Sequence, residues 1–242
     1  MTNFNFKGVE AIATDIDGTL TKPNYLLSIE AIQSIRELEK IGIKVILISG
    51  HVFPTVSALS QYVGTSGPIV AENGCVIGYR WEPILLGDPI EDREKVVKLM
   101  IDLGFEEAPT NKFRYIDLAF RRTSRSNLSV ETLYDLLEKN GINGIEIHDS
   151  GFAVHISPKG LNKGVGLRKA LELAKIDPNK TIAIGDGDND LPFFSVVGFS
   201  VAVANASENL KKQANLVLER GNGEGFQELA KMIINAKKKE EY

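Results

Sequence analysis

The sequence is poor in cysteine, with only Cys75 among its 242 residues. A single cysteine excludes a disulfide within the chain, and with it the small secreted domains that disulfides stabilise. Long hydrophobic runs are absent too: no apolar stretch approaches the about 18 residues of a membrane-spanning helix. The chain also opens without the basic and then apolar pattern of a secretion signal. These absences predict a cytoplasmic protein that does not associate with a membrane.

An excess of positive charge is also lacking. The chain has 28 Lys and Arg against 32 Asp and Glu, which gives a formal net charge of −4. Proteins that bind nucleic acid by neutralising its phosphates carry a basic surface. The composition therefore argues against a nucleic-acid partner. A hydrophobic fraction of 43% is ordinary for a globular protein, and the length suits a core with a smaller second domain.

Short apolar runs alternate with amphipathic segments at both ends of the chain. This order implies a parallel sheet with right-handed crossovers, so we predict an α/β fold with a doubly wound, Rossmann-like core. The predicted elements are strands 9–14, 43–48 and 68–71 with helices 28–40 and 54–62 between them, then helix 162–175, strand 181–184, helix 189–196, strand 199–203 and helices 207–213 and 224–236.

The middle of the chain has a different rhythm. Residues 84–157 predict an α+β segment that ends in an antiparallel hairpin, with helices 90–103 and 129–140 and strands 115–121, 145–149 and 152–156. We interpret this segment as a smaller α+β cap domain inserted into the core. The core domain would then be discontinuous and comprise residues 1–83 and 158–242.

Acidic and small residues follow three of the predicted core strands. Asp15 and Asp17 follow the first strand, Ser49 and Gly50 follow the second, and 185-GDGDND-190 follows strand 181–184. Ligands bind beyond the C-terminal ends of the strands in open α/β sheets. Turns alone favour Asp and Gly, but the same chemistry at three neighbouring strand ends favours a binding site.

The clustered carboxylates indicate a cation. Two carboxylates ~4 Å apart repel by roughly 4 kcal/mol at an effective dielectric of about 20. Oxygen ligands without a His or Cys cluster favour Mg²⁺ or Ca²⁺ over Zn²⁺. Neither Asp15 nor Asp186 opens an EF-hand pattern, which leaves Mg²⁺, an ion that usually works together with substrate phosphates. Ser49 and the Gly50 N–H are the candidate phosphate ligands, and Lys163 opens helix 162–175 at the end where the helix dipole does not favour a cation.

The order Asp-x-Asp-Gly-Thr, Ser-Gly, Lys and Gly-Asp-x-x-x-Asp resembles the haloacid-dehalogenase superfamily of phosphohydrolases. The resemblance implies that Asp15 is the nucleophile and that Asp17 is the general acid and base. It implies further roles for the other matching residues: Mg²⁺ binding by Asp15, the Asp17 backbone carbonyl, Asp186 and Asp190, and phosphate binding by Ser49, Gly50, Lys163 and Asn189.

The inserted cap and the sequences of residues 14–21 and 71–74 are similar to those of the archaeal phosphoglycolate phosphatases. This resemblance implies hydrolysis of 2-phosphoglycolate through an aspartyl-phosphate. Two alternatives stay open: a sugar phosphatase or phosphomutase with the same site, and a phospho-acceptor signalling module, which the large insertion fits badly. The implied partner is a small phosphorylated acid or sugar, bound by a monomer or a homodimer.

One residue departs from the family pattern. His51 follows Ser49-Gly50 at a position where relatives often carry Asn or Arg. Two roles are compatible with the sequence: a contact to the substrate, or a cap for the helix that follows.

Overall fold

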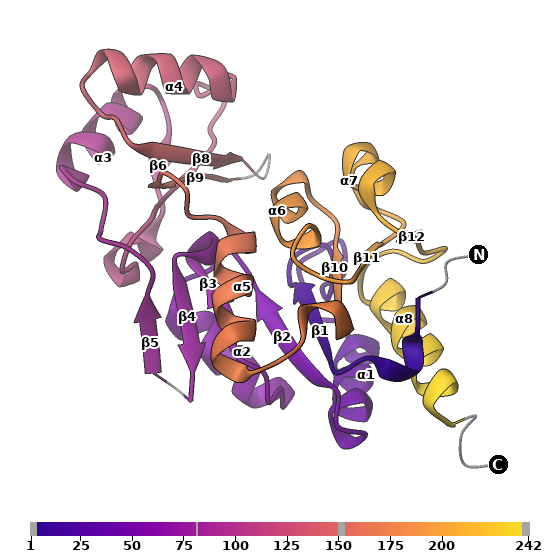
Figure 1. Ribbon diagram of the computed structural model, residues 1–242. Coiled ribbons are helices and arrows are strands. Elements are labelled where there is room, and N and C mark those ends of the chain that lie inside the picture. The colour runs from indigo at the N-terminus through magenta and orange to yellow at the C-terminus, as the bar shows by residue number, and fades with distance from the viewer. Residues whose placement is uncertain (1–3, 81, 150–152, 239–242) are drawn as a thin grey trace.

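The structure, a computed structural model, describes residues 4–80, 82–149 and 153–238 (Figure 1). It contains an eight-stranded sheet in the order β12-β11-β10-β1-β2-β3-β4-β5 and a separate four-stranded sheet in the order β6-β7-β9-β8. The large sheet is parallel from β12 to β3. This architecture confirms the predicted α/β class, with a doubly wound core and a smaller α+β insert.

The strands of the large sheet carry the candidate site at one edge. Every residue of the central strand β1 is buried, and β1 pairs in parallel with β10 on one side and β2 on the other. The C-terminal ends of these three strands therefore meet. The strands are β1 (Ala11–Asp15), β2 (Lys44–Ile48), β3 (Ile69–Ala71), β4 (Val76–Tyr79), β5 (Glu82–Leu85), β10 (Thr181–Gly185), β11 (Phe199–Ala202) and β12 (Leu216–Val217).

In the large sheet, strands β4, β5 and β12 were not predicted from the sequence. Strands β4 and β5 extend the sheet antiparallel to β3, and Pro83 lies in the edge strand β5, where a missing N–H disrupts no central ladder. Strand β12 has only two residues and carries no periodic signal. These strands depend on pairing with a neighbour that is already in place, which local sequence does not report.

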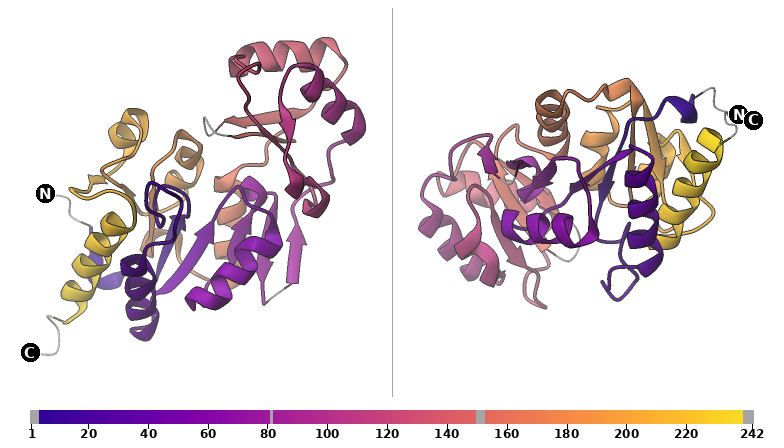
Figure 2. Two further views of the ribbon diagram at one scale, coloured as in Figure 1. Left: turned by 180° about the vertical axis from the view of Figure 1, so that it is seen from behind. Right: turned by 90° about the horizontal axis from the view of Figure 1, so that it is seen from below.

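Helices cover both faces of the large sheet. Figure 2 shows α1, α2 and α8 on one face and α5 on the other. The start of α1 is confirmed at Ser28, whose Oγ accepts a hydrogen bond from the Ala31 N–H. The core helices are α1 (Ile29–Lys40), α2 (Phe53–Val63), α5 (Lys163–Ala174), α6 (Leu191–Phe194), α7 (Glu208–Gln213) and α8 (Asn222–Lys238), and 3₁₀ turns lie at Phe6–Gly8, Glu72–Gly74, Pro178–Lys180 and Asp188–Asp190.

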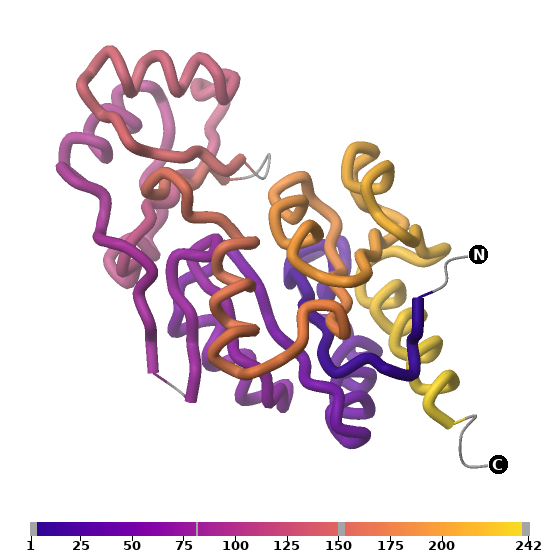
Figure 3. The backbone as a smooth tube through the Cα atoms, in the orientation of Figure 1, coloured from indigo at the N-terminus to yellow at the C-terminus, as the bar shows by residue number. Residues whose placement is uncertain are grey.

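The insert packs around a hydrophobic core of its own, which includes Phe120, Leu133 and Ile156. Figure 3 shows the chain passing into the insert after β5 and returning from it into α5. Strands β8 and β9 form the predicted antiparallel pair, while residues 150–152 lie outside the described residues. The elements are α3 (Arg93–Asp102), β6 (Glu106–Glu107), the 3₁₀ turn Pro109–Phe113, β7 (Leu118–Arg121), α4 (Val130–Lys139), β8 (Ile145–Asp149) and β9 (Ala153–Pro158).

The domain boundaries at residues 84 and 157 stay a prediction. Within the described ranges, no helix combines the length and the apolar character needed to cross a bilayer.

Candidate active site

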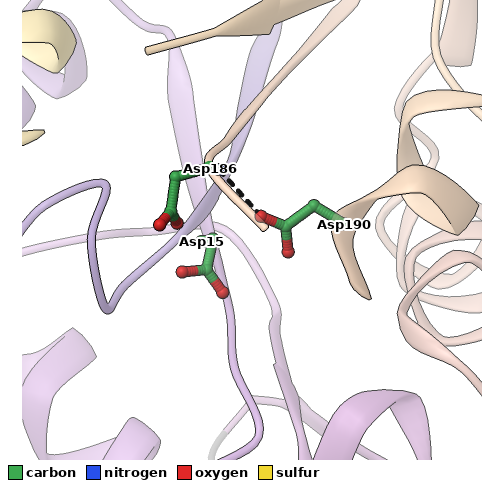
Figure 4. Close-up of side chains that lie close together, drawn as sticks. All are labelled: Asp15, Asp186 and Asp190. Carbon is green, nitrogen blue, oxygen red and sulfur yellow. Dashed lines mark hydrogen bonds between the residues drawn. The ribbon is translucent and has the colours of Figure 1, made fainter. Parts of the chain in front are cut away.

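Three carboxylates gather at the C-terminal edge of the large sheet. Asp15 is the last residue of β1, Asp186 follows β10 directly, and Asp190 closes the 3₁₀ turn Asp188–Asp190. One side-chain oxygen from each lies within 4.8 Å of the other two. Figure 4 shows the three side chains together at the ends of these elements. These three aspartates, which are far apart in the chain, thus lie together at the sheet edge as the sequence predicted.

Lys163 supplies a positive charge to this acidic cluster. It is the first residue of α5, after the N-cap Asn162, and its side chain is 3% exposed. Its Nζ donates to Asp15 Oδ1 at 2.5 Å and to Asp190 Oδ1 at 2.6 Å. A lysine at a helix start is disfavoured by the helix dipole. The two carboxylates give a physical reason for its position.

Asp190 uses both carboxylate oxygens to hold its surroundings. Oδ1 accepts from Lys163, and Oδ2 accepts from the backbone N–H groups of Asp186 at 2.9 Å and Gly187 at 3.0 Å. A Cβ at Gly185 would lie 2.4 Å from Asp190 Oδ2, so only glycine fits there. Asp190 therefore fixes both the ammonium group of Lys163 and the turn that presents Asp186.

The electrostatics of the cluster fit a divalent cation. Burial raises the pKa of Asp15 well above its ordinary value despite the neighbouring Lys163, and Asp190 and Asp186 raise it further. Burial and the charge of Asp190 raise the pKa of Asp186 to about 7. With all three carboxylates ionised, the cluster and the Lys163 ammonium would carry two net negative charges. The donors are all oxygen atoms, the ligands that Mg²⁺ prefers.

This charge balance predicts a pH-dependent effect of Mg²⁺ on stability. The folded-state pKa of Asp186 lies above its ordinary value of 3.8, at about 7, so its contribution to stability is lost as pH rises through that interval. In EDTA, the unfolding free energy is expected to fall between about pH 4 and about pH 7 from this group. Mg²⁺ should therefore raise the melting temperature more at about pH 8 than at about pH 5. Calorimetry with and without EDTA tests this; an equal Mg²⁺ effect at both pH values would contradict it.

Asp17 is not one of the three clustered carboxylates. The chain leaves β1 at Asp15 and turns, and the partly exposed Asp17 Oδ2 lies 2.8 Å from His51 Nε2. Burial alone would raise the pKa of Asp17, but the hydrogen bond and charge of His51 outweigh it and lower that pKa. Helix α2 begins after Val52 without a side-chain cap, so the capping role considered for His51 is wrong.

The turn after Asp17 packs directly on the acidic cluster. Gly18 has a φ of +83°, and a Cβ there would lie 2.1 Å from Asp186 Oδ2. Thr19 Oγ1 donates to Asp186 Oδ1 at 3.1 Å. The glycine of the Asp-Gly-Thr motif is therefore explained by this turn, which needs a left-handed backbone and has no room for a side chain beside Asp186.

The Ser49-Gly50 loop follows β2 beside these residues. Ser49 is buried, and its Oγ accepts from the His51 N–H at 3.0 Å. Gly50 is tightly enclosed: a Cβ there would lie 3.0 Å from Asn73 Oδ1 and 3.3 Å from His155 Cε1. Asn189 is half-buried on the turn that carries Asp186 and Asp190. Asp188 on that turn is exposed and accepts a hydrogen bond from Ser207 Oγ, in line with a turn-forming role.

A buried polar cluster between insert and core was missed by the sequence analysis. It comprises Glu72, Asn73, Arg114, Asp117 and His155, and we call it the interface cluster. The Arg114 side chain is only 3% exposed. The Ala-Glu-Asn-Gly motif at 71–74 could have indicated this cluster, because it lies at the C-terminal end of a core strand. Nothing local marks Asp117 as buried.

A comparison with protein-family models identifies the family. The model described as haloacid dehalogenase-like hydrolase matches residues 12–116 and 105–229, which together span both the core and the insert. The chain belongs to the haloacid dehalogenase-like hydrolase family. This membership confirms the resemblance that the four motifs carried.

Relatives of this haloacid dehalogenase-like hydrolase match it over nearly their whole lengths. A phosphoglycolate phosphatase of Metallosphaera sedula is 35% identical, with 94% of this chain and 100% of the relative covered. One of Methanococcoides burtonii is 36% identical, with 94% and 97% covered. A crystal structure of a Thermoplasma acidophilum protein has a TM-score of 0.82 at 28% identity, with 93% of this chain and 98% of that one covered.

Proposed function

We propose that this hydrolase is a Mg²⁺-dependent phosphomonoesterase that converts 2-phosphoglycolate into glycolate and phosphate. The observation that carries the reaction class is the buried Lys163 between Asp15 and Asp190, with Asp186 beside them at the sheet edge. The full-length relatives named phosphoglycolate phosphatase support the substrate. The site would have to recognise a small substrate that carries a phosphate at one end and a carboxylate at the other.

The reaction would proceed in two displacements at phosphorus. Lys163 holds Asp15 Oδ1, which leaves Oδ2 to attack. A bond forms between Asp15 and phosphorus as the bond to the glycolate oxygen breaks, and the product is an aspartyl-phosphate. Water then attacks the same phosphorus and releases phosphate, which restores the Asp15 carboxylate. Lys163 balances the charge that develops on the phosphoryl oxygens.

Asp17 would move the protons in both displacements. It gives a proton to the leaving alkoxide and takes one from the attacking water. His51 lowers the pKa of Asp17 before substrate binds. A bound phosphate dianion repels the Asp17 carboxylate and so raises its pKa, which favours the protonated form when the leaving group needs it.

The remaining site residues would bind Mg²⁺ and phosphate. Asp15, Asp186 and the Asp17 carbonyl would hold the ion, with Asp190 in support, and the ion would neutralise phosphoryl charge. The buried Ser49 hydroxyl, the Gly50 N–H and the Asn189 amide would donate to phosphoryl oxygens. These donors come from the ends of the two strands that flank β1, so they surround Asp15.

Phosphate release from a panel of phosphomonoesters tests the proposal. 2-Phosphoglycolate, sugar phosphates and p-nitrophenyl phosphate are compared in Mg²⁺ and in EDTA. We expect Mg²⁺-dependent turnover with the highest kcat/KM for 2-phosphoglycolate. Activity spread over sugar phosphates would retain the mechanism and reject the substrate. Absence of Mg²⁺-dependent turnover on all of them would reject the enzyme.

A further inference from the structure

The interface cluster joins the insert to the Ser49-Gly50 loop. Arg114 of the insert donates through Nη2 to the Gly50 carbonyl at 3.0 Å and through Nη1 to Asp117 Oδ1 at 2.5 Å. Asp117 Oδ2 lies 3.4 Å from Asn73 Nδ2 and 3.2 Å from His155 Nδ1. One guanidinium therefore bridges a carboxylate of the insert and the backbone of the candidate phosphate loop.

A second set of contacts reaches the same loop through residues 72 and 73. The Glu72 carboxylate accepts from the N–H groups of Tyr115 at 3.1 Å and Ile116 at 3.0 Å. The Glu72 N–H donates to the His51 carbonyl at 2.9 Å, and the Asn73 N–H donates to the Ser49 carbonyl at 3.1 Å. Segment 114–117 of the insert thus supports the loop directly and through this intermediate turn.

Burying the charged groups of this cluster has a desolvation cost, so its presence calls for an explanation other than stability. The side chains of Arg114 and Asp117 are 3% and 0% exposed, and Arg114 Nε is buried without a hydrogen-bond partner among the described residues. Burial alone would raise the pKa of Asp117, but Arg114 and His155 hold it well below its ordinary value. Buried ion pairs add little to stability compared with apolar packing. The planar guanidinium of Arg114, however, fixes the positions of the groups that accept its hydrogen bonds.

We infer that Arg114 is a positioning residue through which the insert holds the Ser49-Gly50 loop in its phosphate-binding geometry. The inference rests on the proposed phosphate site. On this inference, the interface cluster controls the affinity for the phosphoryl group, which all substrates share. It does not contact the rest of the substrate. By reciprocity, phosphate binding should also stabilise the docking of segment 114–117.

Arg114→Lys is the decisive variant, with Arg122→Lys as its matched control. Lysine keeps the charge beside Asp117 but lacks the planar fork that reaches Asp117 and Gly50 together. Arg122 forms a comparable pair with Asp149 inside the insert, and its other donors bind Ser126 and Leu128. Calorimetric titration with inorganic phosphate in Mg²⁺ should show affinity weakened by about three- to tenfold in R114K, the effect of one hydrogen bond, and unchanged in R122K.

Kinetics distinguish positioning from substrate reading. KM should rise by the same factor for 2-phosphoglycolate and for p-nitrophenyl phosphate in R114K. A rise confined to 2-phosphoglycolate, or an unchanged phosphate affinity, would overturn the inference. The double variant R114M/D117N removes both charges together and should weaken phosphate binding similarly if R114K does not fold.

Hydrogen exchange on the unaltered protein provides an independent test. Phosphate with Mg²⁺ should slow exchange of the Tyr115 and Ile116 amides, which bind Glu72, and leave the amides of α4 unchanged. No slowing despite phosphate binding would overturn the positioning role alone. Absence of phosphate binding by the unaltered protein would instead reject the proposed function, so the two failures are distinguishable.

Discussion

Replacing Asp15 by Asn is expected to lower phosphatase turnover by about 10⁴-fold or more, because an amide cannot form the acyl-phosphate. The change also removes the negative charge that Asp15 places beside Lys163. Turnover of 2-phosphoglycolate by the two proteins measures the effect. Acid-quenched protein incubated with radiolabelled substrate should retain label in the unaltered enzyme and none in D15N.

Asp188→Asn is the matched control for Asp15. Asp188 lies on the turn with Asp186 and Asp190 but is exposed and bonded to Ser207. Its amide variant is expected to change turnover by less than about twofold, as surface changes usually do. Turnover of D15N at the level of the unaltered enzyme would eliminate Asp15 as the nucleophile.

Replacing Lys163 by Met is expected to have the second largest effect, on both stability and activity. Asp15 and Asp190 would lose their shared cation in a buried site, which costs about 3 to 5 kcal/mol when one partner of a buried pair is removed. Turnover should fall by about 10³-fold, since the charge on the phosphoryl oxygens loses its stabilising ammonium. Urea unfolding and phosphate release measure the two effects.

The stability loss in K163M should depend on pH. Burial and neighbouring carboxylates already raise the pKa values of Asp15 and Asp186, and losing Lys163 raises them further. Carboxyl groups with raised folded-state pKa values stabilise the fold at low pH and lose that contribution as pH rises. In EDTA, K163M should therefore be destabilised more at about pH 8 than at about pH 5. A loss that is equal at both would assign the effect to packing of the lysine side chain.

Lys169→Met provides the control on the same helix. Lys169 pairs with Glu172 at 2.8 Å, and both side chains are substantially exposed. Exposed pairs contribute at most about 1 kcal/mol. K169M should therefore unfold at nearly the same urea concentration as the unaltered protein at both pH values.

Local patterns were enough to predict most of the core. The buried apolar run 45–48 of β2 and the amphipathic spacing in α1 are each dictated by residues close in sequence. Strands β4 and β12 were missed because they are short and acquire their structure from a neighbouring strand. The parallel pairing followed from the alternation of strands and helices, since a helix between two strands returns the chain to the end of the sheet where the first strand began.

The sequence by itself determined that Asp15 and Asp186 would meet. Both lie at the ends of core strands, and the C-terminal ends of parallel strands share one sheet edge. Only the tertiary structure decided which partners they take there. Asp17 turns toward His51, and Arg114 reaches Gly50 from the insert. Those contacts join segments whose separation is set by how two hydrophobic cores pack, and no short-range pattern encodes that distance.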